Sequence, residues 1–362
     1  MNARRDFLQS ITEVSQLKGL EIGALDSPLV TAQELADRGK IFYLDHLSTE
    51  DLCSKYEDDD SVNKGKIVSV DFICPDGDIV KATKKEKFDY VVASHVVEHA
   101  PDLLKFLKEI NDILNPGGVF FLVVPDKRFT FDLNRPETTF GSVLRAFLAR
   151  DTKPGVDVVY DHFSMATKVN GHNRWHGIGN KEDQSLLLSE AKAWDLAQDV
   201  NNKDEYFDVH VNVFTPRSFF EILKKVISHG IVSFEVQKFT DTQIGQIEFL
   251  VGLRKPLVGL TENQKKKQCL ETIPDLPLES ILSPYMPQIK SLSSALGAMA
   301  TTNQNLQDAI EVLRTKFDDN EQALVELEGR LRVAQRTLDR KSVRFILAAV
   351  EKIYSTFRGR KS

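Results

Sequence analysis

Three acidic residues, Glu21, Asp45 and Asp71, each stand within or at the end of a short apolar run, and Gly23 closely follows the first of them. Such runs predict buried strands of an α/β sheet, where ligands bind beside the carboxyl ends of the strands. The glycine lets the backbone approach a ligand or adopt a positive φ. A carboxylate suits ribose hydroxyls or a cationic group, whereas the G-x-G-x-x-G spacing that a pyrophosphate needs is absent. Glu21 and Asp45 therefore predict a ribose-bearing ligand with a cationic or amino group.

The elements that position these residues follow from apolar periodicity. Strands are expected at 17–22, 41–45, 66–72, 88–95 and 119–125, with helices over 4–16, 31–38 and 103–110. Asn115-Pro-Gly-Gly118 ends the third helix, because proline cannot continue it and glycine accepts a left-handed cap. Two more apolar runs, 231–239 and 246–253, have no helix between them and predict an antiparallel hairpin.

Three segments together resemble the class I S-adenosylmethionine-dependent methyltransferases. Glu21-x-Gly23 is similar to the family's motif I, and the runs from Asp89 to His99 and from Leu114 to Pro125 are similar to its motifs IV to VI. The resemblance covers about residues 1–255. It implies a Rossmann-like α/β fold, with a doubly wound, mostly parallel seven-stranded sheet whose last strand is reversed, and S-adenosyl-L-methionine as cofactor. The later glycines of the family's motif I are replaced by Leu25 and Ser27, which leaves a non-catalytic scaffold with the same fold as an alternative.

The family's pattern assigns cofactor contacts residue by residue. It implies that Glu21 and Gly23 hold the methionine end, Asp45 the ribose, Asp71 and Phe72 the adenine, and that Ser94 and His95 border the methyl group.

A long segment, 126–213, is expected to form a helical insertion on the acceptor side, with helices over 140–149 and 183–199. It contains His162, His172, His176 and His210. An imidazole can take a proton near neutral pH, so His162, His176 and His210 are the candidates for a general base. Ordinary polar packing and metal binding are the alternatives. We expect no metal site, because the histidines are scattered apart from His172-x-x-x-His176 and the segment contains no cysteine.

The C-terminal part has a different pattern. Repeated prolines over 256–290 predict a linker, and apolar residues spaced alternately by four and three over 291–339 predict a coiled coil that self-associates. A single amphipathic helix packed on its own domain is the alternative. The tail, 340–362, combines an apolar and a basic face, which suits an anionic membrane surface or the last turns of the coil.

Composition narrows the function further. A net charge of −6 argues against a generic nucleic-acid binder, and the three cysteines, far apart and odd in number, indicate reduced thiols. We expect a cytoplasmic enzyme, peripheral at the inner face of the plasma membrane through its tail. The combination of a coiled coil and a basic tail is similar to the domain architecture of methyltransferases that modify bacterial surface polysaccharides. This resemblance implies O-methylation of a sugar. A small-metabolite O- or N-methyltransferase is the alternative.

Overall fold

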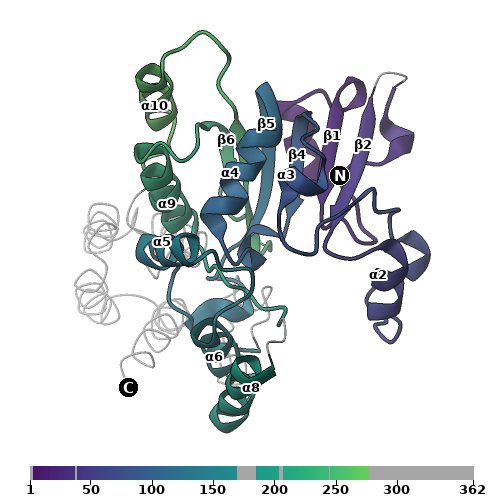
Figure 1. Cartoon of the computed structure of the whole chain (residues 1–362), viewed down its shortest axis with the longest axis vertical. Helices are drawn as coiled ribbons and strands as arrows, with labels where there is room; N and C mark the ends of the chain where they lie inside the picture. The colour runs from purple at the N-terminus through teal and green to yellow at the C-terminus, as the bar shows by residue number, and fades with distance from the viewer. Residues whose placement is uncertain (1–2, 37–38, 169–184, 204–206, 244, 277–362) are drawn as a thin grey trace, which may run out of the picture. The chain divides into compact units, whose positions relative to one another are not determined.

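The computed structural model describes residues 3–36, 39–168, 185–203, 207–243 and 245–276 of the 362-residue chain. The chain divides into two compact units, and the first comprises Met1–Thr167 and Leu186–Asp275. All the elements below belong to this first unit (Figure 1). The predicted coiled coil and tail lie outside the described residues and stay predictions. Every helix within the described ranges is too short or too polar to cross a membrane.

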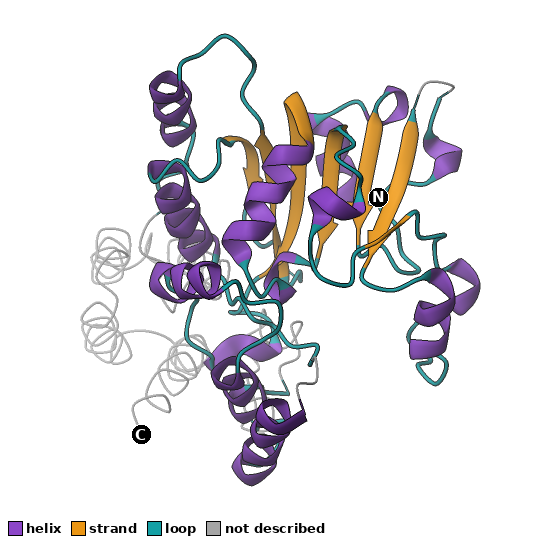
Figure 2. Cartoon of the chain, viewed as in Figure 1, coloured by secondary structure: helices purple, strands orange, loops and turns teal. Residues whose placement is uncertain are grey.

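The first unit is built on a seven-stranded sheet in the order β3-β2-β1-β4-β5-β7-β6 (Figure 2). The strands are β1 (Lys18–Ile22), β2 (Lys40–Asp45), β3 (Phe72–Ile73), β4 (Phe88–Ser94), β5 (Leu114–Pro125), β6 (Glu235–Thr240) and β7 (Glu248–Arg254). The first five run parallel, while β7 is antiparallel to both of its neighbours, β5 and β6. The predicted doubly wound sheet with a reversed last strand is confirmed.

Helices cover both faces of this sheet. On β5, Phe121 stacks on Phe7 of α1 (Ala3–Ile11) with ring centroids 5.2 Å apart. The adjacent Phe120 contacts Phe106 of α4 (Leu103–Ile113) at 6.2 Å. Because neighbouring residues on a strand point to opposite faces, α1 and α4 lie on opposite sides of the sheet.

The remaining helices complete the layers and the insertion. They are α2 (Thr49–Lys55), α3 (Ile79–Ala82), α5 (Phe140–Ala149), α6 (Val156–Met165), α8 (Glu190–Lys203), α9 (Pro216–Ser228) and α10 (Glu262–Glu271), with 3₁₀ turns at Val14–Gln16, Ala32–Glu34, Lys64–Lys66, Val97–His99 and Phe131–Asn134. Helix α9 begins with a capped first turn, in which the Thr215 hydroxyl accepts the Ser218 N–H and Pro216 occupies the first helical position.

Three expectations need correction. The helix expected over 31–38 is only the 3₁₀ turn Ala32–Glu34, and the third strand is the two-residue β3 rather than 66–72. The linker expected over 256–290 contains α10, whose Cys269 is fully buried, and the first unit runs on to Asp275. The globular domain is therefore longer than the predicted 1–255.

Candidate active site

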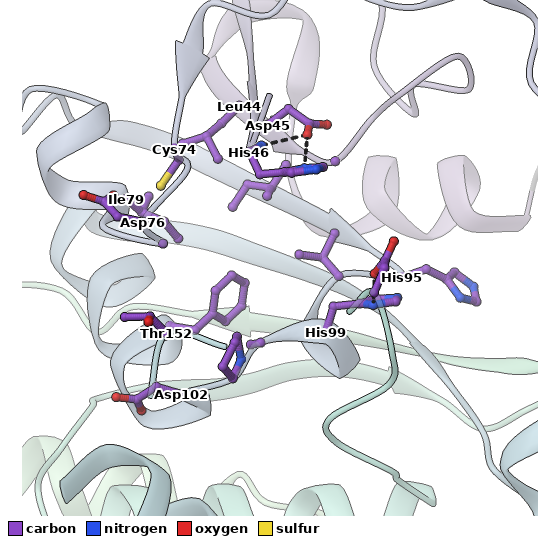
Figure 3. A pocket seen from close by; sticks show the side chains of 18 of the residues that line it. Leu44, Asp45, His46, Cys74, Asp76, Ile79, His95, His99, Asp102 and Thr152 are labelled. Atoms are coloured by element: carbon purple, nitrogen blue, oxygen red, sulfur yellow. Dashed lines mark hydrogen bonds and ion pairs between the residues drawn. The ribbon is translucent and has the colours of Figure 1, made fainter. Parts of the chain in front are cut away.

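A cavity of about 360 Å³ opens where β1, β2 and β4 reach their carboxyl ends (Figure 3). Gly23, Asp45 and His95 line it, and so do His99 and Asp208. This is where a doubly wound sheet binds ligands, because the loops that leave neighbouring strands diverge there. The cavity therefore brings together three of the seven residues that the family's pattern assigns to the cofactor.

Gly23 makes the turn after β1. Its φ is +66°, and a Cβ at this position would lie 3.0 Å from Cγ2 of Val96, which also lines the cavity. Its N–H donates to the Leu44 carbonyl at 2.9 Å, which ties the turn to the end of β2. A side chain here would be strained and would narrow the cavity.

Asp45 ends β2 with its side chain in the cavity wall. One carboxylate oxygen, Oδ1, accepts the His46 backbone N–H at 2.7 Å and lies 2.6 Å from Nδ1 of the His46 ring. The carboxylate is 8% exposed, so it is held in one orientation with the cavity as its open side. A carboxylate so placed can accept hydrogen bonds from a ribose diol.

Glu21 lies outside the cavity lining and makes different contacts from those expected. Its carboxylate is 1% exposed and accepts the backbone N–H groups of Leu29 at 2.7 Å and Val30 at 3.1 Å. Burial raises the pKa of Glu21 to about 7, against the lowering effect of these two hydrogen bonds. Glu21 therefore positions the loop after Gly23 instead of lining the ligand cavity.

The residues expected at the adenine end are also displaced. Asp71 accepts the Tyr43 backbone N–H at 2.9 Å, and Phe72 packs among rings, with Phe42 at 5.6 Å. Neither lines the cavity, whose wall at the end of β3 contains Cys74 and Asp76 instead. The physical reason is that β3 extends to Ile73, so the carboxyl end of this strand comes after Phe72 and not at Asp71.

At the end of β4, Ser94 and His95 take part in an ionic network. Ser94 lies outside the cavity lining, and its hydroxyl accepts from Arg4 at 3.4 Å. His95 has a φ of 54°, and its Nε2 is 2.7 Å from Glu248, which also binds Arg4 at 2.5 and 2.6 Å. Burial works against a charged ring, but the carboxylates of Glu248 and Glu98 outweigh it and raise the pKa of His95 to about 9. His95 is therefore a cation at neutral pH.

The candidate bases of the insertion that the structure describes are His162 and His210. Neither of them lines the cavity, and His176 lies outside the described residues. His210 is 8% exposed, and its Nδ1 is 2.5 Å from Oδ2 of Asp132. Burial lowers the pKa of His162 to about 4, which keeps its ring neutral. The structure thus places neither His162 nor His210 on the cavity wall, and their role as bases stays a prediction.

The histidine that sequence reasoning missed is His99. It lines the cavity, lies 2.9 Å through Nδ1 from Asp208, and meets the ring of His210 edge-on with centroids 4.9 Å apart. Among the described residues, His99 also belongs with Glu98 and His210 to a group whose donor atoms lie within 4.8 Å of one another. His210 is 111 positions away in the sequence, so no local spacing signals this group.

These residues fit S-adenosylmethionine, the cofactor that the resemblance implies. The Gly23 turn has no side chain to fill the cavity, and Asp45 offers a carboxylate at the end of β2. The loop with Cys74 and Asp76 would border the adenine, and the acceptor would enter from the side of His99. Figure 3 shows Asp45 and His46 on one side of the cavity and His99 and Asp102 on another.

Comparison with known proteins gives the family. The model of a family described as "Methyltransferase domain" matches residues 33–226. A ubiquinone biosynthesis O-methyltransferase from Nitrobacter winogradskyi is 25% identical over 135 residues, which make up 37% of this chain and 48% of that protein. The chain thus spans about half the length of this curated relative.

Similar solved structures include a SAM-dependent methyltransferase from Methanosarcina mazei, 15% identical, with 69% of this chain and 97% of that chain covered and a TM-score of 0.36. One from Aquifex aeolicus is 10% identical, with 70% and 89% covered and a TM-score of 0.36. Since the family match covers more than half of the chain, the protein belongs to the methyltransferase domain family, as a class I S-adenosylmethionine-dependent methyltransferase.

Proposed function

We propose that the protein transfers a methyl group from S-adenosylmethionine to a hydroxyl oxygen of a sugar in bacterial surface polysaccharide biosynthesis. The observation that carries the proposal is a single cavity with two unlike ends. One end has Asp45 at the end of β2, where a ribose would bind, and the other has a set of polar side chains beside His99.

The polar end suits an acceptor with several hydroxyl groups. Asp102, Thr152 and Asp208 line the cavity with His99, so it offers both hydrogen-bond acceptors and a hydroxyl donor. Contact with His99 lowers the pKa of Asp208 to about 2, so this carboxylate accepts hydrogen bonds at any physiological pH. The N. winogradskyi relative is named as an O-methyltransferase, which favours oxygen over nitrogen as the acceptor atom.

The bound cofactor supplies a methyl group already activated by its positively charged sulfur. The protein's own residues have two tasks, which are to hold the acceptor oxygen in line with that methyl group and to promote loss of the hydroxyl proton. Asp45 and the Gly23 turn would fix the cofactor, and the polar side chains around His99 would fix the acceptor.

A product analysis tests this proposal. The full chain would be incubated with S-adenosylmethionine carrying a labelled methyl group and with matched acceptors, namely nucleotide sugars and oligosaccharides, catechols, and primary amines. We expect label on a sugar oxygen, located by tandem mass spectrometry. Label on catechols or amines alone would contradict the sugar proposal, and absence of cofactor binding in calorimetry would support the scaffold alternative.

A further inference from the structure

A buried carboxylate beside the cavity has no hydrogen bond. Glu98, in the 3₁₀ turn after β4, is 0% exposed, and neither of its carboxylate oxygens has a hydrogen-bond partner. Among the described residues, its ionic neighbour is His95, whose Nδ1 lies 3.4 Å from Oε1 of Glu98. A charged group so placed is costly unless a hydrogen bond, a counter-ion or a metal satisfies it.

Two imidazoles lie near this carboxylate, and each has another carboxylate beside its Nδ1. Nδ1 of His210 is 2.5 Å from Asp132, and Asp132 is itself fixed by Arg135 at 2.8 Å. Nδ1 of His99 lies 2.9 Å from Asp208, as an ion-pair contact off the line of a hydrogen bond. The His210–Asp132 contact is the one that orients metal-binding histidines, because a carboxylate hydrogen-bonded to one ring nitrogen leaves the other nitrogen as the ligand.

The spacing of the three side chains suits one ion. One donor atom from each of Glu98, His99 and His210 lies within 4.8 Å of the other two. Ligands at 2.0–2.2 Å from a tetrahedral ion stand about 3.4 Å apart, so small side-chain rotations would close the site. Two imidazoles and one carboxylate favour zinc, iron or manganese over calcium.

We propose that Glu98, His99 and His210 bind one divalent transition-metal ion, with an open position toward the cavity that His99 lines. Its catalytic role, unlike the binding itself, rests on the proposed function. The acceptor hydroxyl would bind at the open position, where the ion makes its proton easier to lose to water. The oxygen then forms its bond to the methyl carbon, the carbon–sulfur bond breaks, and its electron pair stays on the sulfur of the leaving thioether.

Three acids, Glu98, Asp132 and Asp208, surround the proposed site, and each has a basic neighbour. Arg135 lies 2.8 Å from Asp132, His95 lies 3.4 Å from Glu98, and Lys55 lies 3.8 Å from Asp208. The rival arrangement is that His95 alone neutralises Glu98, in which case the three side chains would bind no ion.

The test measures metal content and not activity alone. The full chain would be stripped with a chelator, titrated with Zn²⁺ and with Mn²⁺, dialysed and analysed by plasma mass spectrometry, with Co²⁺ absorption as a second readout. We expect the wild-type chain to retain one ion. Its affinity for that ion should fall at least about 100-fold in Glu98→Gln and in His210→Ala, and about 10–100-fold in Asp132→Asn, which changes the carboxylate that orients His210.

Two control variants locate the ion. His229→Ala removes a ring that stacks on Phe140 at 5.5 Å, and it should leave affinity unchanged. His176→Ala removes half of the His172-x-x-x-His176 pair, so ions lost in this variant and retained in His210→Ala belong elsewhere. Circular dichroism of each variant checks that it folds.

The proposal is overturned if the stripped wild-type chain binds no ion, or if the Glu98 and His210 variants bind as tightly as the wild type. Metal-free wild type that still binds S-adenosylmethionine but has lost methyl transfer would support the catalytic role. An ion bound at this site without sugar methylation would uphold the site and contradict the proposed function instead.

Discussion

At the scale of single residues, Glu21 shows how a motif position can be predicted while its role is missed. The acid lies two residues before the glycine, as in the family, but the structure uses it to hold the backbone of Leu29 and Val30. Asp45 was predictable because its strand ends at the acid. Asp71 was not, since the length of β3 depends on pairing with β2, which no local pattern specifies.

The pKa of Glu21 gives stability a dependence on pH. It is raised from 4.5 to about 7, so the folded chain holds the proton more tightly than the unfolded chain between these values. Stability from this group is therefore complete below pH 4.5 and is lost as pH rises through 7. Between pH 5 and 8 we expect the wild type to lose about 2–3 kcal/mol relative to Glu21→Gln in urea unfolding. Parallel pH profiles for the two proteins would contradict the shift.

Asp45 and Asp71 form a matched pair for the cofactor site. Asp45→Ala should weaken S-adenosylmethionine binding by about 1.5–3 kcal/mol, the range for hydrogen bonds to a charged group. Asp71→Asn keeps an oxygen for the Tyr43 N–H and lies outside the cavity lining, so its affinity should match the wild type. Calorimetry measures the affinity of both variants for S-adenosylmethionine. The assignment of Asp45 to the ribose is wrong if the folded Asp45→Ala protein binds the cofactor as tightly as the wild type does.

At the scale of elements, the sequence indicated most strands and their directions, because apolar runs and the Asn115-Pro-Gly-Gly118 turn are local signals. The helix expected after β1 was wrong for a non-local reason. Glu21 binds the amides of Leu29 and Val30, and the Tyr43 hydroxyl donates to the Val30 carbonyl at 2.7 Å. These contacts hold the chain before Thr31, and only a 3₁₀ turn follows.

Strand β1 depends on a glycine that its apolar pattern does not explain. The Tyr90 ring of β4 crosses Gly19 so closely that a Cβ there would lie 2.0 Å from Cζ, and Tyr90 is fully buried. Gly19→Ala should therefore lower the free energy of unfolding by about 1–3 kcal/mol or more. Gly141→Ala in α5, where the new Cβ has its nearest neighbour at 3.7 Å, should raise it by about 0.5–1 kcal/mol. Denaturant unfolding that ranked the two variants in the opposite order would contradict this packing.

At the scale of the whole molecule, the C-terminal boundary of the globular domain differs most from its prediction, since it lies at Asp275 and not at residue 255. Prolines suggested a linker from 256, yet α10 packs back on the sheet. The Val236 N–H of β6 donates to Thr272 at 2.8 Å, Gln268 donates to Glu235, and Cys269 is fully buried. Cutting the chain after Lys255 should therefore cost stability, on the order of 2–3 kcal/mol, relative to cutting after Asp275. Equal unfolding midpoints for the two truncated chains would argue for a linker.

The chain that ends at Asp275 also isolates the last prediction, which concerns assembly. Positions 292–338 repeat apolar residues alternately four and three apart, with Asn303 and Asn320 in the same seam. A single isolated helix cannot bury an apolar stripe on its own surface, so the stripe needs a second helix to cover it. A buried pair of asparagines favours a defined register between parallel chains. We expect light scattering to give a dimer or trimer for the full chain and a monomer for residues 1–275. The same number of chains per particle in both would place self-association in the globular domain and leave the repeat as an amphipathic helix that covers its own chain.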